Sequence, residues 1–127
     1  MIEFLNSIQN SLIYKNFFLV LSGLDNTILL LLISLPLGFV LALLFALGRV
    51  SKITLLSRTI ASYIFVIRGT PLLVQIYLIY FGLGSIELIR ESILWHLLKE
   101  PFWCGVLALT INTVAYGSEI FLSLIHI

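Results

Sequence analysis

The feature that most constrains the fold is an uncharged stretch from Asn26 to Gly48. Its core, residues 27–48, comprises 22 residues dominated by Leu, Ile, Phe and Ala. A helix of that length measures about 33 Å, which matches the hydrocarbon thickness of a bilayer. The run is too long for a secretory signal peptide, and no small-residue cleavage pattern follows it. We therefore predict a transmembrane helix over 27–48.

The composition of the chain agrees with a membrane protein. Of its 127 residues, 61% are hydrophobic and 10% are charged, whereas an ordinary soluble domain carries about 25% charged residues. The many aromatic residues argue against disorder. A net charge of +1 gives no indication of a nucleic-acid partner. The predicted class is an all-α, integral membrane helical bundle in the lipid bilayer.

Two more uncharged stretches predict two more spans, which we place at 71–84 and 102–121. The first follows a break at Arg68-Gly69-Thr70-Pro71, where proline fits the first turn of a new helix. This span is short. A smaller tilt, a locally thinner bilayer, or a kinked junction with the preceding helix would each compensate for its length.

The remaining segments are predicted to lie at the membrane surface. Residues 1–24 are expected to form an interfacial helix, and residues 85–100 a water-exposed, partly helical connection. Residues 51–67 are also predicted as an interfacial helix, because apolar residues recur along one helical stripe. The members of that stripe are Ile53, Leu56, Ile60, Ile64 and Ile67.

The basic residues predict the orientation. The connection between the first two spans contains Arg49, Lys52, Arg58 and Arg68 and no acidic residue. Because basic residues favour the cytoplasmic side, this connection is expected in the cytoplasm and the N-terminus outside. The third span then ends at the cytoplasmic face.

A stripe of small residues follows one side of the first span, at Ser34, Gly38, Ala42 and Ala46. Small residues four apart let another helix backbone approach closely in lipid. The stripe predicts a specific helix–helix contact, although Ala and Gly are common in any membrane helix.

Polar side chains within the spans are the candidates for a solute pathway. Asn112 and Glu119 share a face of the third span, and Gln75 lies one turn beyond the Gly-Thr-Pro break. Such groups are costly to expose to lipid, so they should face a bundle interior or a wet cavity. Alternatively, Asn112 only cross-links helices and Glu119 lies in interfacial water. Arg68 could equally be a plain cytoplasmic anchor.

Nothing in the sequence indicates an enzyme or a resident cofactor. Cys104 lies in an apolar run, where a small buried hydrophobe is the common role. His96 and His126 have no second ligand at metal-binding spacing. No phosphate-binding glycine loop occurs, so this chain is not expected to bind ATP itself.

Three ordered motifs resemble the permease subunits of bacterial ABC importers for polar amino acids, the histidine, glutamine, arginine and opine group. The most specific runs from Arg68-Gly69-Thr70-Pro71 through Gln75 to Tyr80-Phe81-Gly82. The others are Gly48-Arg49-Val50-Ser51 after the first span and Thr110 to Ile120 in the third. The resemblance covers residues 23–121.

This resemblance implies a multi-pass subunit with the type I importer fold, usually of five spans, in the bacterial plasma membrane. It implies a second permease subunit, two cytoplasmic ATPase subunits and an external solute-binding protein that delivers a polar amino acid. ATP hydrolysis would then belong to the ATPase and not to this chain.

The end of the chain departs from the pattern, because Leu122 stands where the family has arginine. Residues 122–127 also resemble translated adapter DNA, so we expect a C-terminally truncated permease with an artefactual tail. The alternative is a self-contained, three-span membrane protein with a structural, assembly or channel-like role.

Overall fold

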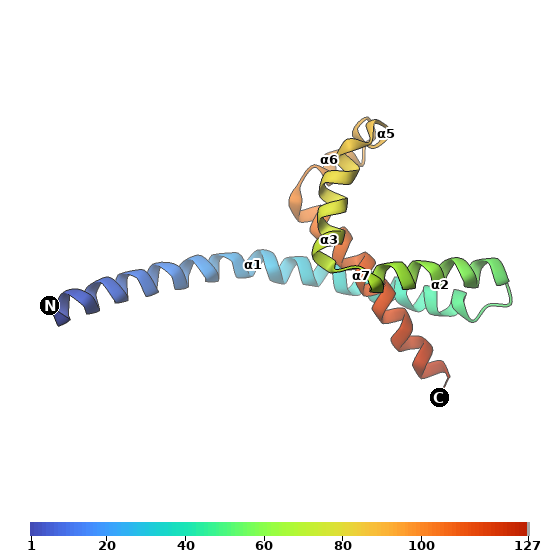
Figure 1. Ribbon diagram of the computed structural model, residues 1–127, viewed down its shortest axis with the longest axis horizontal. Coiled ribbons are helices and arrows are strands. Elements are labelled where there is room, and N and C mark those ends of the chain that lie inside the picture. The colour runs from blue at the N-terminus through green and yellow to red at the C-terminus, as the bar shows by residue number, and fades with distance from the viewer. Residues whose placement is uncertain (127) are drawn as a thin grey trace.

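The computed structural model describes residues 1–126, and within this range the chain forms helices and no strand. Three long helices, α1, α2 and α7, build most of the molecule, and short elements connect α2 to α7 (Figure 1). In chain order the elements are α1 (Ile2–Arg49), α2 (Thr54–Gly69), α3 (Leu72–Tyr77), the π-helix η1 (Leu78–Gly82), α4 (Leu83–Ser85), α5 (Glu87–Arg90), α6 (Trp95–Leu98) and α7 (Pro101–Ile125).

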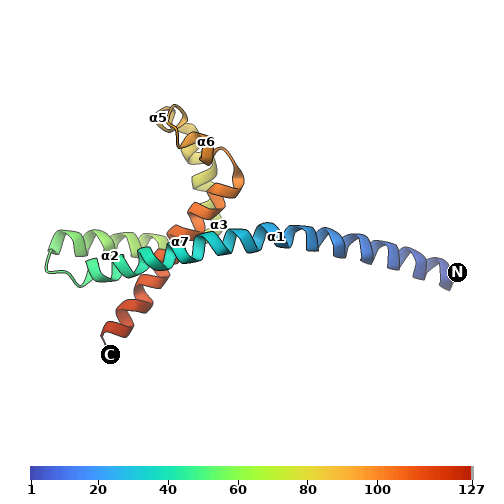
Figure 2. The same cartoon turned by 180° about the vertical axis from the view of Figure 1, so that it is seen from behind.

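Helix α1 is much longer than a single span, with 48 residues and therefore a length of about 72 Å. Its N-terminal half extends away from the rest of the molecule in both views (Figures 1 and 2). The sequence predicted a separate helix over 1–24, but the structure continues through Gly23 without a break. A glycine inside a helix costs only about 1 kcal/mol, and the surrounding Leu, Ile and Phe residues all favour the helix more than glycine does.

Helix α2 returns alongside the C-terminal end of α1 after a turn at residues 50–53 (Figures 1 and 2). At its own end the chain bends by 105° into α3. Thr70 and Pro71 are both extended at this break, with ψ angles of 139°. Proline disfavours helical geometry in the residue before it, which explains why α2 ends here.

Helix α7 crosses α1 and holds the molecule together (Figure 1). Pro101 occupies its first turn, where the missing N–H costs nothing. The fully buried positions of the core are small: Ala42 and Ala46 of α1 and Ala108 and Ala115 of α7 have no exposed surface. The core is thus a close contact of two backbones with few large side chains between them.

Two described helices, α1 and α7, are long and apolar enough to cross a membrane. The bent pair of α2 with α3 to α4 adds a third if it counts as one span. Helix α7 continues to Ile125, into the predicted tail 122–127, of which Ile127 lies outside the described residues.

Candidate functional site

The polar candidates of the sequence meet at the bend between α2 and α3. Gln75, in the first turns of α3, is 6% exposed. Its amide nitrogen donates to the backbone oxygens of Ile67 and Thr70, at 2.7 and 3.1 Å, and lies 2.9 Å from the Thr70 hydroxyl. The last carbonyls of a helix lack partners within it. Gln75 therefore caps α2 from across the bend and fixes the angle between the helices.

Asn112 of α7 joins this cluster from the other side. Its amide nitrogen donates to the Gln75 side-chain oxygen at 3.3 Å. Asn112 is only partly buried, and its own side-chain oxygen makes no hydrogen bond within residues 1–126. The structure thus brings two of the three pathway candidates together, and the Asn112 oxygen is left free to accept a hydrogen bond.

The third candidate, Glu119, pairs with Arg68 two turns further along α7. Their side chains are 3.0 Å apart and about 44% and 43% exposed. The Arg68 guanidinium also lies over the Tyr116 ring, 5.4 Å from its centroid, at a distance that permits a cation–π interaction. Arg68 of the family motif therefore ties the end of α2 to α7.

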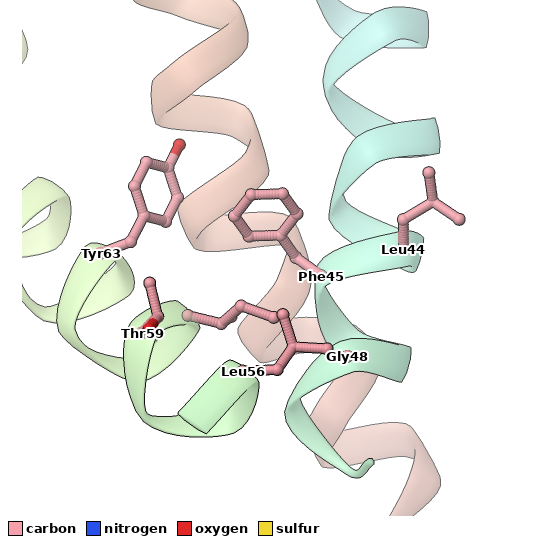
Figure 3. A pocket seen from close by; sticks show the side chains of 7 residues that line it. Leu44, Phe45, Gly48, Leu56, Thr59 and Tyr63 are labelled. Carbon is pink, nitrogen blue, oxygen red and sulfur yellow. The ribbon is translucent and has the colours of Figure 1, made fainter. Parts of the chain in front are cut away.

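A further tie, which the sequence did not predict, comes from Tyr63 in the middle of α2. Its hydroxyl donates to the backbone oxygen of Ile111 on α7 at 2.7 Å. Its ring is close to that of Phe45 on α1 (Figure 3), and the ring centroids are 5.2 Å apart. A tyrosine inside an apolar run was the available signal, because a buried hydroxyl needs a partner.

The predicted small-residue stripe of α1 lies against α7. Ser34, Gly38, Ala42 and Ala46 are the buried residues of α1. A Cβ atom added to Gly38 would lie 2.6 Å from the Cβ atom of Thr113. One added to Gly117 of α7 would lie 2.9 Å from that of Ala42. Glycine is therefore required from both helices for this close approach.

The site offers hydrogen bonds and charge. No group of three His, Cys, Asp or Glu side chains that could hold a metal occurs within residues 1–126. Cys104 is 1% exposed and its thiol donates to the Leu98 oxygen. The arrangement can position a polar solute or transmit a movement between helices.

Known proteins resemble this chain closely in sequence, although no family model matches it. It is 44% identical over 108 residues to the octopine transport system permease protein OccM of Rhizobium radiobacter, covering 85% of this chain and 44% of OccM. It is 43% identical over 110 residues to the nopaline transport system permease protein NocM of Agrobacterium fabrum, covering 86% and 46% of the two chains.

The fold agrees with these relatives. A crystal structure of an amino acid ABC transporter with histidines matches with a TM-score of 0.73 and 38% sequence identity. The match covers 87% of this chain and 48% of that one. The chain thus spans about half the length of the relatives it matches.

Fold and sequence together define a helical membrane component of an ABC transporter. Within that class, the chain belongs to the family of permease subunits for polar amino acids and opines. The resemblance identified from the ordered motifs is confirmed.

Proposed function

We propose that this chain forms part of the membrane pathway through which an ABC importer moves a polar amino acid or an opine across the bacterial plasma membrane. The observation that carries this proposal is the 44% identity to an octopine permease over 108 residues. The relatives are transport permeases, so a self-contained structural protein is the weaker alternative. The substrate class comes from the relatives' names, since no described residue selects one amino acid.

Asn112 and Glu119 are the residues we assign to the pathway itself. Both are partly exposed and belong to one helix. Asn112 has an amide oxygen without a hydrogen bond in the described chain. Glu119 binds Arg68 through one carboxylate oxygen, and its other oxygen makes no hydrogen bond in the described chain, so it can accept one from a solute. Gln75 is buried and its amide is directed to backbone oxygens, so its contribution would be to hold Asn112 in place.

The proposed assembly has a second permease subunit, cytoplasmic ATPase subunits that hydrolyse ATP, and an external solute-binding protein. The family resemblance supports these partners. Basic residues favour the cytoplasmic side of a membrane. Arg49 and Lys52 lie at the C-terminal end of α1, so this end would face the cytoplasm and the N-terminus would be external.

Uptake of labelled arginine, histidine, glutamine and octopine into cells carrying the full-length permease and its neighbouring transport genes tests the proposal. Asn112→Leu should reduce uptake at least tenfold at normal membrane abundance. Asn16→Leu, the same change at an exposed position of α1, should leave it unaltered. Wild-type uptake by Asn112→Leu would remove Asn112 from the pathway.

Co-purification tests the partners separately. The full-length permease should bring down an ATPase subunit after mild detergent extraction. A homo-oligomer without any ATPase would contradict the importer and favour the self-contained membrane protein.

A further inference from the structure

An apolar groove separates α1 and α2 next to their connecting turn (Figure 3). Its volume is about 420 Å³. It extends from the turn toward the aromatic pair of Phe45 and Tyr63. The lining residues are Leu44, Phe45, Gly48, Leu56, Thr59, Ile60 and Tyr63.

The interior of this groove offers few partners to a polar ligand. Only Thr59 and Tyr63 contribute side-chain hydroxyls, and both donate to backbone oxygens, to that of Leu55 at 2.9 Å and that of Ile111 at 2.7 Å. The ammonium and carboxylate groups of an amino acid placed there would lose their hydration and find no charged partner in the lining, which is costly. The groove therefore suits a hydrocarbon chain, not the transported solute.

The turn at the end of the groove carries positive charge without any acidic partner. Arg49 directly follows the lining residue Gly48, and its guanidinium donates to the Ser57 hydroxyl at 2.8 Å, a neutral group. Lys52 lies exposed in the same turn. Within residues 1–126, the ion pair found is that of Arg68 with Glu119, so both charges are uncompensated.

We propose that this groove binds an anionic phospholipid, with an acyl chain between α1 and α2 and the headgroup phosphate at Arg49 and Lys52. The apolar groove matches the acyl chain of such a lipid, and the basic turn matches its negatively charged headgroup. Basic pockets beside membrane helices on the cytoplasmic side bind anionic headgroups in this way. The predicted orientation places the turn on that side.

Native mass spectrometry of the full-length permease, purified in mild detergent and titrated with phosphatidylglycerol or phosphatidylcholine, tests the headgroup contact. The wild type should retain phosphatidylglycerol preferentially. Each of Arg49→Gln and Lys52→Gln should weaken that binding about fivefold. Arg58→Gln is the matched control, since Arg58 lies about 160° around α2 from Ile60. Equal retention of both lipids, or equal losses in all three variants, would overturn the proposal.

A second pair of variants tests the acyl-chain contact. Thr59→Phe fills the groove and should reduce retention of phosphatidylglycerol, whereas Leu55→Phe adds the same ring outside the lining and should not. A photoreactive benzophenone side chain at position 59 should cross-link to lipid. Cross-linking to a protein segment instead would show that another helix occupies the groove and would overturn the proposal.

Discussion

Helix α7 makes two contacts of opposite character, one with α1 and one with the bend between α2 and α3. The contact with α1 includes Gly38 and Ala42 facing Thr113 and Gly117, and no side-chain hydrogen bond joins the two helices within residues 1–126. The contact with the bend includes the hydrogen bond from Asn112 to Gln75 and the ion pair of Glu119 with Arg68. One depends on shape, and the other on directed polar groups.

The difference indicates which of the two contacts can rearrange. A close-packed contact between backbones admits one geometry, because packed surfaces do not deform continuously. Hydrogen bonds and exposed ion pairs can exchange partners at small cost, since each contributes about 1 kcal/mol or less. Of the two contacts, the one at the bend can therefore rearrange at the lower cost.

The largest effect should follow a change of shape at the α1–α7 contact. Gly38→Leu forces a side chain where a Cβ atom alone would lie 2.6 Å from Thr113. Overpacking of this kind costs about 3 kcal/mol, so we expect a lower thermal midpoint in detergent and less permease in the membrane. Gly23→Leu is the control, because no packed side chain or other helix lies within 4 Å of its added Cβ atom. Equal stability of the two variants would contradict this packing.

A smaller loss should follow when the bend loses its cap. Gln75→Leu leaves the Ile67 and Thr70 oxygens and the Asn112 amide without that partner, at a cost of about 2 kcal/mol. A double-mutant cycle with Asn112→Leu should give a coupling of about 0.6 kcal/mol, typical of interhelical hydrogen bonds in membranes. Additive losses in thermal stability would show that Gln75 and Asn112 act independently.

Much of this contrast could be predicted from the sequence, because each contact corresponds to a recognisable residue pattern. The spacing of four between Ser34, Gly38, Ala42 and Ala46 indicated a close helix contact without naming its partner. Pro71 indicated the break between α2 and α3. The family resemblance then supplied the fold class, which composition alone left at a helical membrane protein.

The partners within the site could not be predicted, since they depend on the angle between helices. A bend of 105° decides that Gln75 reaches back to Ile67, and no local pattern encodes that angle. The pairing of Arg68 with Glu119 joins residues 51 positions apart. Tyr63 was missed because its acceptor is a backbone oxygen of another helix.

One substitution at the α1–α7 contact should increase stability, because this contact depends on shape and not on polar groups. Ser34 is fully buried there, and its hydroxyl has no hydrogen-bond partner in the described chain. Ser34→Ala removes an unsatisfied polar group at nearly constant volume and should raise the free energy of unfolding by about 1 kcal/mol. A loss of stability on thermal unfolding would mean that the hydroxyl has a partner in the assembled permease.

The smallest effect on stability is expected at the Arg68–Glu119 pair of the bend. Here, unlike at the α1–α7 contact, a substitution should affect transport more than stability. Both side chains are nearly half exposed, so Glu119→Gln should cost about 0.5 kcal/mol, and less at high salt. If the bend is the moving contact, the same variant should still change the rate of uptake, because releasing one tie shifts the balance between two arrangements of α2 on α7. Arg68→Gln releases the same tie and leaves the pathway residue Glu119 in place, so it should change the rate of uptake in the same direction. Unaltered transport by Glu119→Gln would instead leave the pair as a surface contact and place the movement elsewhere.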